Sequence, residues 1–452
     1  MSAARSGMSS DGLASYFKFA ERGTDLVTEA RAGLTTFMVM AYIIFLNPAI
    51  LSAAGIDVPA AAAATALVAG VMTIAMGIVG NYPLAMAAGL GINGVVAFTL
   101  VLGKGLTLPG AMGVIVLEGI VVTVLVLAGL REAIMNAVPL ALKRSIGVGI
   151  GLFILFIGFV NGGFIVTPEG GGTPVTVVFP TTTANFVFLL GLAVTIALYV
   201  MKIRAALIIS IIVTTIIALL TGVQTVPSDL VATPSFGTIG QFDVANVFSK
   251  LGLLTALLTI FAIMLTDFFD TMGTVTGVAA EAGLSRPDGS VPGICRVLLV
   301  DSVAAIAGGA AGISSNTTYI ESAAGVAEGG RTGFASVITG ILFLLAIFLS
   351  PIAGVIPSVA TAPVLVLVGY LMFTLVKDIP VADPEDGIPA LLTMVLMPLT
   401  YDITVGIGAG FISWVLIKVV RGKFGEIHPL MWVVSIAFLV YFAKDWIQAV
   451  IG

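Results

Sequence analysis

Two long stretches without a charged side chain constrain this sequence more than any other feature. No Asp, Glu, Lys or Arg occurs between Asp57 and Lys104, and none occurs between Arg331 and Lys377. A membrane-spanning helix needs about 20 apolar residues, so each stretch is long enough for two spans. The chain of 452 residues is 59% hydrophobic and only 10% charged, unlike soluble globular proteins. The sequence therefore predicts an integral membrane protein.

The rest of the composition excludes several kinds of functional site. Cys295 is the single cysteine, which excludes a disulfide framework and a cysteine-based metal cluster. His428 is the single histidine and flanks a late apolar segment, so a serine-histidine triad has no other histidine to use. No Walker motif, HExxH motif or Rossmann fingerprint occurs in a suitable context. We therefore expect no metal, no cofactor, no nucleic-acid partner, and a lipid bilayer around the chain.

The apolar segments predict an all-α protein with fourteen spans and a cytoplasmic N-terminus, in the inner or plasma membrane. The spans, numbered 1 to 14, cover about residues 32–54, 58–80, 83–102, 109–130, 145–161, 184–201, 205–222, 253–277, 294–312, 316–329, 333–351, 360–376, 387–399 and 402–420. When the spans are threaded in this order from a cytoplasmic N-terminus, every Lys and Arg up to Lys423 falls on the cytoplasmic side except Lys104 and Lys250. This bias is typical of membrane proteins with that orientation. Residues 1–30 are expected to lie on the cytoplasmic surface as an amphipathic segment. The C-terminal apolar segment covers residues 426–452, and its stretch 429–447 fits an interfacial helix as well as a span.

Internal similarity indicates that the chain consists of two related halves. Three pairs match at nearly one offset: "LTTFMVMAYIIFLNP" from Leu34 with "LTIFAIMLTDFFDTM" from Leu258, "GLGIN" from Gly89 with "GISSN" from Gly312, and Pro139 with Pro363. With seven spans per half, an odd number, the second half has the inverted orientation. Inverted repeats are typical of transporters that hold their substrate near the membrane midplane between discontinuous helices.

Segments 3 and 10 are the ones that we expect to be discontinuous. Segment 3 begins at Pro83 and has three glycines within six residues, from Gly89 to Gly94. Segment 10 follows "AGGAAGISSN" and has about fourteen residues before "EGGRTG". An extended stretch followed by a half-helix leaves backbone N–H groups free at the start of the half-helix. The two segments therefore predict a polar binding site inside the membrane.

Segment 8 contributes two carboxylates at membrane depth. Asp267 and Asp270 in "LTDFFDTMGT" are three residues apart, and Thr274 follows Asp270 by one turn, so all three share a helix face. Ionisable residues inside a membrane mark a pathway, a proton relay or a substrate contact. The alternative, that this part of the helix lies at the water interface, fits poorly because uncharged residues flank both sides.

Segment 10 offers a third carboxylate, Glu321, in "NTTYIES". One interpretation is a capping box, in which Asn316 or Thr318 is the N-cap residue and Glu321 is the N3 partner of Thr318. The other is a binding site at the start of a half-helix, and the two are compatible. Asn93 in segment 3 aligns with Asn316 and offers a donor and an acceptor, although a helix-helix hydrogen bond is its alternative role.

Other candidates are weaker. Tyr319 and Phe98 could stack on a flat ring, although packing is the simpler role for Phe98. Glu118 in segment 4 and Asp301 in segment 9 are further charges at depth, for which we expect support or relay roles.

Together, "NTTYIES", "FFDTMGT" and "GLGIN" resemble the nucleobase-ascorbate transporter superfamily, in particular its AzgA-like branch of purine permeases. The resemblance runs from about Phe17 to Arg421. It implies the uracil-permease fold: fourteen spans in two inverted repeats, with short β-strands in segments 3 and 10. It also implies a core domain from residues 31–130 and 251–352, and a gate domain from residues 131–250 and 353–425. A homodimer formed through the gate domain is a further expectation.

The resemblance also implies roles for individual residues. Tyr319 would stack on the base, Ile320 would offer its backbone, and Glu321 would bind ring nitrogens; the uracil permease has glycine in place of Ile320. Gly91 and Asn93 match positions implicated in purine recognition. Asp267 and Asp270 would divide base binding and proton transfer between them, and the resemblance does not tell which does which.

These observations predict a purine nucleobase:proton symporter for adenine, guanine or hypoxanthine, with an elevator-like movement of the core against the gate. Asp267, Asp270 and Glu321 are the expected proton-coupling residues, supported by Thr274, Asn316, Thr318 and Asp301. Coupling to Na⁺ is an alternative, because carboxylates and broken-helix carbonyls also bind Na⁺. An anion exchanger of the same fold is a second, although clustered carboxylates would repel an anion. A membrane hydrolase is a third, but the aspartate pair lacks a water-activating partner.

Overall fold

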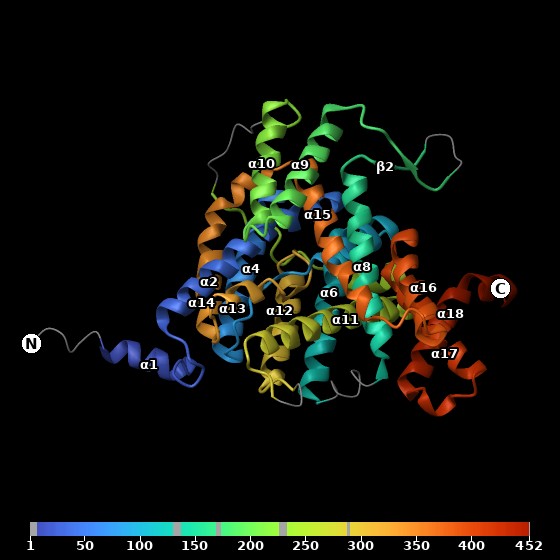
Figure 1. The fold of residues 1–452 in the computed structure, drawn as a ribbon. Helices are drawn as coiled ribbons and strands as arrows, with labels where there is room; N and C mark the ends of the chain where they lie inside the picture. Colours follow the sequence, from blue (N-terminus) through green and yellow to red (C-terminus); the bar gives the residue numbers. More distant parts are fainter. Residues whose placement is uncertain (1–6, 130–136, 169–172, 226–232, 287–289, 452) are drawn as a thin grey trace, which may run out of the picture.

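The computed structural model describes residues 7–129, 137–168, 173–225, 233–286 and 290–451 as a mainly helical protein (Figure 1). The α-helices are α1 (Gly7–Phe17), α2 (Leu26–Met40), α3 (Ile43–Leu51), α4 (Val58–Ala75), α5 (Leu90–Gly94), α6 (Leu108–Leu127), α8 (Leu140–Asn161), α9 (Thr183–Val200), α10 (Ala206–Leu220), α11 (Val244–Glu281), α12 (Ile294–Ala310), α13 (Ser322–Ala327), α14 (Gly333–Ala346), α15 (Ser358–Phe373), α16 (Pro384–Thr400), α17 (Ile403–Val420) and α18 (Pro429–Ile451). Tighter or wider helical turns are η1 (Ser52–Ala54), η2 (Met76–Gly80), η3 (Val95–Gly103), η4 (Ile347–Val355), η5 (Thr374–Asp378) and η6 (Phe424–Glu426). The strands are β1 (Met86–Ala88), β2 (Ile165–Val166), β3 (Thr176–Val177) and β4 (Asn316–Thr318).

Within the described residues, nine helices are long and apolar enough to cross a membrane. Three shorter apolar helices, at Leu90–Gly103, Ala206–Leu220 and Pro429–Ala443, add to them. The prediction of a multi-pass helical membrane protein is therefore confirmed, whereas the count of fourteen spans stays a prediction. The first span begins earlier than expected, at Leu26, because the Asp25 side chain accepts hydrogen bonds from the backbone N–H groups of Val27 and Thr28.

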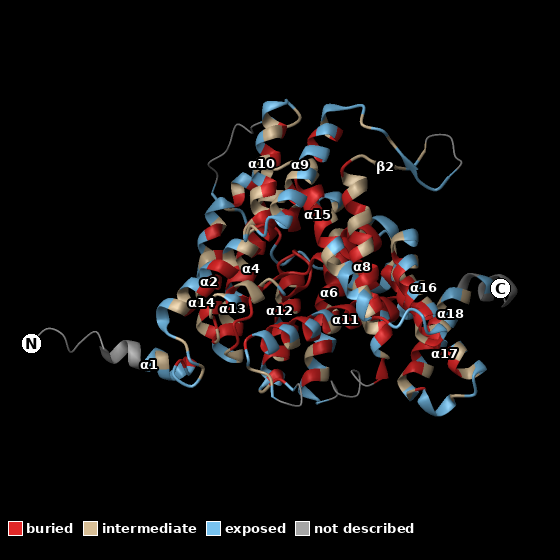
Figure 2. Ribbon diagram, viewed as in Figure 1, coloured by how far each residue is buried: buried red, intermediate tan, exposed pale blue. Residues whose placement is uncertain are grey.

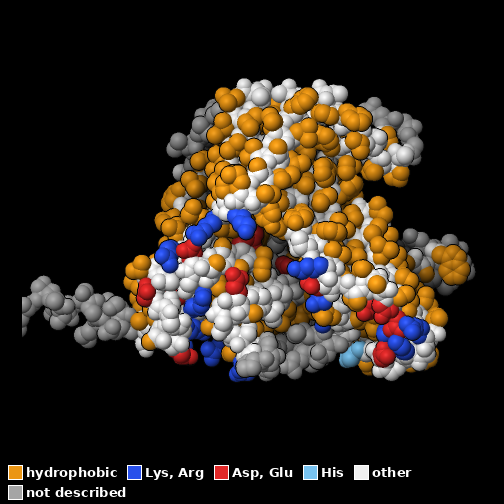
Figure 3. Space-filling model, in the orientation of Figure 1, with side chains coloured by type: hydrophobic (Ala, Val, Ile, Leu, Met, Phe, Trp, Pro, Cys, Tyr) orange, Lys and Arg blue, Asp and Glu red, His pale blue; other side chains and the backbone are white. Residues whose placement is uncertain are grey.

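Exposed and buried residues divide as expected for a protein that faces lipid. Figure 2 shows buried residues concentrated where α6, α11 and α12 meet, and exposed residues at the free ends of α9 and α10. Hydrophobic side chains cover the upper part of the face in Figure 3, and charged side chains gather below it. Such a large apolar surface would be unstable in water and suits a hydrocarbon environment.

The helices pack in two groups. The first group, which we call the strand-bearing group, consists of α2, α4, α6, α11, α12, α13 and α14 together with β1 and β4. The second group consists of α8, α9, α10, α15, α16 and α17. The expected boundary at residues 250 and 251 falls inside α11, beside a break at Gly252, where φ is +70°. The expected boundary at residues 130 and 131 lies outside the described residues.

Two short strands cross in the middle of the strand-bearing group. β1 and β4 pair antiparallel, with Met86 opposite Thr318 and Ala88 opposite Asn316. The Thr73 hydroxyl on α4 satisfies the backbone of Met86 by accepting from its N–H at 2.9 Å and donating to its carbonyl at 3.1 Å. Buried backbone away from water must find such partners, so side chains complete what two short strands leave open.

Glycine allows the second crossing segment to pass close to α12. A Cβ atom on Gly308 would lie only 2.1 Å from the carbonyl oxygen of Ser314 and 3.3 Å from Cβ of Asn316. Because no side chain fits there, Gly308 lets the stretch before β4 lie directly on the helix backbone.

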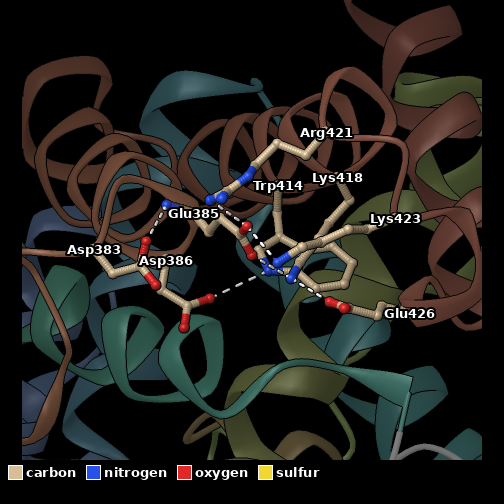
Figure 4. Close-up of polar contacts among 8 residues, drawn as sticks. All are labelled: Asp383, Glu385, Asp386, Trp414, Lys418, Arg421, Lys423 and Glu426. Atoms are coloured by element: carbon tan, nitrogen blue, oxygen red, sulfur yellow. Dashed lines mark hydrogen bonds and ion pairs between the residues drawn. The ribbon is translucent and has the colours of Figure 1, made fainter.

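A charged cluster joins the start of α16 to the end of α17 (Figure 4). Glu385, which is 6% exposed, accepts from Nζ of Lys418 and from Nζ of Lys423, each at 2.6 Å, and pairs with Arg421. Lys418 also donates to Glu426 at 2.6 Å. Glu385 lies in the first turn of α16, outside the nine long apolar helices. The cluster therefore ties the ends of two helices together at the edge of the second group.

We expect acid to weaken this cluster. Hydrogen bonds from Lys418 and Lys423 lower the pKa of Glu385 from 4.5 to about 2. A lowered pKa in the folded state means that the carboxylate stabilises the fold above its ordinary pKa, and that this contribution is lost as the pH falls from about 4.5 towards 2. The melting temperature of the purified protein should fall over this range. Glu385→Gln should lower it at neutral pH and flatten its acid dependence; an unchanged acid dependence in that variant would contradict the assignment.

Candidate functional site

The predicted site residues surround the crossing of β1 and β4. Asp267, Asp270 and Thr274 lie on α11, and Asp301 lies on α12. Gly91 and Asn93 lie on α5, directly after β1. Asn316 and Thr318 form part of β4, and Tyr319, Ile320 and Glu321 link β4 to α13. The fold therefore brings residues from distant parts of the chain to one place.

Asp301 and Asp267 support the extended stretch around β4. Asp301 accepts hydrogen bonds from the Thr271 hydroxyl at 2.7 Å, the Thr317 hydroxyl at 3.4 Å and the Thr318 backbone N–H at 3.1 Å. Asp267, which is 3% exposed, accepts from the Ser315 hydroxyl at 2.7 Å. Hydrogen bonds of this kind compensate part of the cost of burying a carboxylate. Asp301 thus holds the broken segment partly through its backbone at Thr318, and Asp267 holds it through the side chain of Ser315.

Glu321 lies beside a tyrosine from the first span. The Tyr42 hydroxyl, on a fully buried side chain between α2 and α3, donates to Oε1 of Glu321 at 2.6 Å. Tyr319 is also buried; its N–H donates to the Ala85 carbonyl at 3.0 Å, and its hydroxyl donates to the Ala88 carbonyl. The Tyr319 ring is therefore held against β1 at its hydroxyl end.

The capping-box interpretation of Glu321 is wrong. Asn316 and Thr318 lie in a strand, and α13 begins only at Ser322. Glu321 precedes the helix and makes no side-chain cap hydrogen bond. Residues 316–318 pair with β1 as a strand. A capping box requires the N-cap residue to be followed directly by the first turn of a helix, so the spacing of Thr318 and Glu321 does not form one here.

Asp270 lies in different surroundings from Asp267. Asp270 and Gly273 are exposed on one side of α11, and a Cβ atom on Gly273 would meet nothing within 4 Å. Ile320 is 55% exposed. A Cβ atom added to Gly277, which also lies on α11, would be 3.6 Å from Cδ1 of Ile320. α11 thus presents one aspartate to an open space and buries the other, with Thr274 buried one turn further along.

The two asparagines have no hydrogen-bond partner for either side-chain atom within the described structure. Asn93 and Asn316 are both 0% exposed, and all four of their side-chain polar atoms lack a partner. Gly91 packs against the second group: a Cβ atom there would lie 2.5 Å from Cγ2 of Ile150 on α8. Buried amides without partners are costly, and they are the groups that a polar ligand could satisfy.

Sequence reasoning missed Tyr42, Ser315, Thr317 and Thr271 as site residues. Nothing in the sequence near these residues marks them, because hydroxyl side chains are common throughout the chain. Their hydrogen-bond partners lie on distant segments, which only the fold brings together. The sequence also gave no indication that the Ala88 carbonyl accepts from the Tyr319 hydroxyl. Across the described part of the chain, no group of three Asp, Glu, His or Cys residues could hold a metal ion.

The sequence matches known permeases over most of its length. A model of a permease family matches residues 28–409. The chain is 39% identical to the guanine/hypoxanthine permease PbuG of Bacillus subtilis (strain 168) over 443 residues, covering 95% of this chain and 99% of that protein. It is also 39% identical to the adenine permease AdeP of Escherichia coli (strain K12) over 430 residues, covering 95% of both chains.

The fold is similar to that of a solved transporter. The transmembrane domain of a cyanobacterium bicarbonate transporter, BicA, matches with a TM-score of 0.65 at 15% identity, covering 85% of this chain and 97% of that chain. At this identity the similarity shows the fold and not the substrate. The long sequence matches decide the family. The chain is a multi-pass membrane transport protein and not an enzyme, and it belongs to this permease family, in the AzgA-like branch of the nucleobase-ascorbate transporter superfamily.

Proposed function

We propose that this protein imports purine nucleobases (adenine, guanine or hypoxanthine) by proton symport. The observation that carries the proposal is the match, over almost the whole chain, to permeases named for guanine, hypoxanthine and adenine. The exposed carboxylate of Asp270 and the partly exposed Glu321 beside Ile320 support a site for a small polar molecule. The substrate lies between α11 and the residues that follow β4.

The chemistry of a purine suits these groups. A purine ring edge alternates donors and acceptors, so the carboxylate of Glu321 can accept from ring N–H groups while the amide of Asn93 can both donate and accept. Asp270 adds a second acceptor at the open side. Ile320 offers its backbone, and Tyr319 offers its ring face for stacking. A site built to satisfy each polar edge discriminates against molecules that leave one unpaired.

Proton coupling follows from the carboxylates. Asp267, Asp270 and Glu321 are the proposed proton-coupling residues, because a loaded, neutral site crosses the membrane barrier more easily than a bare carboxylate. In the proposed movement the strand-bearing group is the core and slides in an elevator-like way against the second group, the gate. The N-terminus is cytoplasmic, and two copies associate through the gate.

Two other functions make different predictions. Sodium coupling needs Na⁺ for accumulation, and an anion exchanger of the same fold needs a counter-anion. The fold similarity to a bicarbonate transporter raises the second alternative. However, Asp270 and Glu321 at the open side would repel an anion.

Transport in proteoliposomes tests the proposal. Purified protein is reconstituted, and uptake of radiolabelled adenine, guanine and hypoxanthine is driven by an inward proton gradient without Na⁺. We expect accumulation that a proton ionophore abolishes and that each unlabelled purine reduces. Accumulation that persists with the ionophore and requires Na⁺ would replace proton coupling by sodium coupling. Bicarbonate or sulfate exchange without purine uptake would reject the proposal.

A further inference from the structure

Glu118 is a buried ionisable residue to which the proposed site gives no role. It lies in the middle of α6 and is 0% exposed. Both oxygens of its carboxyl group lack a hydrogen-bond partner within the described structure. The neighbouring residue Gly119 lies against the backbone of α12, since a Cβ there would be 2.7 Å from the Ile306 nitrogen. Glu118 thus lies in a tightly packed contact between helices, far from any capping or surface role.

The ionisable neighbours of Glu118 are acidic. α6 packs against α11, α12 and η3. The groups whose charges act on Glu118 are Asp267 on α11 and Asp301 on α12, while η3 has no ionisable residue. Oδ1 of Asp267 also lacks a partner, whereas its Oδ2 accepts from Ser315. Two carboxyl groups with unpaired oxygens therefore lie on helices that pack against each other, α6 and α11. Among the described residues, the charges that act on Glu118 include no basic side chain.

Such an arrangement is compatible with a bound cation or a bound proton. A metal ion needs several ligands, and among the described residues no group of three acidic, His or Cys side chains could hold one. An isolated carboxylate without hydrogen bonds, surrounded by apolar helices and like charges, is very unfavourable, and such groups become neutral instead. The geometry favours the neutral acid.

We propose that Glu118 is a proton-binding site, which holds a proton behind the substrate site and exchanges it with Oδ1 of Asp267. In this exchange the O–H bond on Glu118 breaks, an O–H bond forms on Asp267, and the negative charge moves to Glu118. Asp267 contacts the broken segment through Ser315, which links the proton to the position of β4. This role deepens the proposed proton symport and rests on it.

Infrared spectroscopy tests the protonation directly, without substrate. The purified protein in lipid should show the carbonyl stretch of a buried carboxylic acid at neutral pH. Glu118→Gln should remove that band, and Glu281→Gln, an exposed glutamate at the end of α11, should keep it. A spectrum in which E118Q retains the whole band would overturn the proposal. If E118Q does not fold, Glu118→Asp should shift the band, and an unshifted band would overturn it equally.

Transport then tests the role. In proteoliposomes, E118Q should lose proton-driven accumulation, so that internal purine only equilibrates with external purine, and its uptake should become insensitive to pH. Exchange of internal for external purine should suffer much less. Accumulation with the wild-type pH profile would overturn the proposal. Should the wild-type protein transport no purine, the proposed function fails, while the infrared result still decides whether Glu118 holds a proton.

Discussion

Replacing Asp270 with Asn, or Glu321 with Gln, is expected to abolish purine accumulation while leaving the protein in the membrane. Asp270 is exposed on α11 and Glu321 is partly exposed beside Ile320, so both can contact a bound molecule. Removing a hydrogen bond to a charged group costs about 1.5–3 kcal/mol, which corresponds to about 10- to 150-fold weaker binding. Each replacement also removes a proton-titratable group, so concentration against a gradient is lost as well. Uptake of radiolabelled adenine and hypoxanthine in cells measures the effect.

Matched variants separate binding from folding. Asp267→Asn should also abolish accumulation, because it removes a proposed proton-coupling group and also disturbs the position of β4, since Asp267 is buried and bound to Ser315. Tyr42→Phe removes the 2.6 Å hydrogen bond to Glu321 and should weaken binding less than Glu321→Gln does. Glu281→Gln should transport normally. Wild-type accumulation in the Asp267, Asp270 and Glu321 variants together would refute the site.

Replacing Glu29 with Ala is expected to have the largest effect on stability. Glu29 on α2 is 0% exposed and accepts hydrogen bonds from the backbone N–H groups of Arg331 at 2.7 Å, Thr332 at 3.2 Å and Ala335 at 3.2 Å. It also accepts from the Thr332 hydroxyl at 2.8 Å. The start of α14 would lose these acceptors at once, and leaving buried donors unpaired near a helix N-terminus costs about 3–5 kcal/mol.

Thermal unfolding of detergent-solubilised protein measures this loss. We expect a large fall in the melting temperature of Glu29→Ala, and a smaller fall for Glu29→Gln, whose amide keeps one acceptor oxygen. Glu21→Gln, on an exposed side chain near α1, should leave the melting temperature unchanged. Equal melting temperatures for Glu29→Ala and Glu21→Gln would contradict the role of Glu29.

Much of the architecture could be predicted from local patterns. The uncharged runs beginning after Asp57 and Arg331 predicted membrane helices, because the hydrocarbon interior accepts few other sequences. The glycines and prolines around Gly89 and Gly312 predicted that the neighbouring segments are not regular helices. In the structure Gly89 lies between β1 and α5, and Gly312 lies before β4, which leads into α13. Such signals are local, so they can be read without knowing the neighbours of a residue.

The partners of the polar residues could not be predicted in this way. Glu29 gave no signal in the sequence, because its hydrogen bonds go to the start of α14, about three hundred residues away along the chain. Tyr42 was missed for the same reason, since its partner Glu321 lies on a distant segment. The capping-box interpretation failed because spacing alone could not tell that residues 316–318 pair with β1.

The membrane environment and the broken segments could be inferred from the sequence alone. These follow from the cost of placing charge and unpaired backbone in hydrocarbon, which depends on each residue alone. The three-dimensional packing was needed to show that Asp270 is exposed while Asp267 is buried, and that Glu118 has no hydrogen-bond partner among the described residues. The orientation and partners of a side chain depend on the packing of neighbouring helices, and distant parts of the chain supply those neighbours.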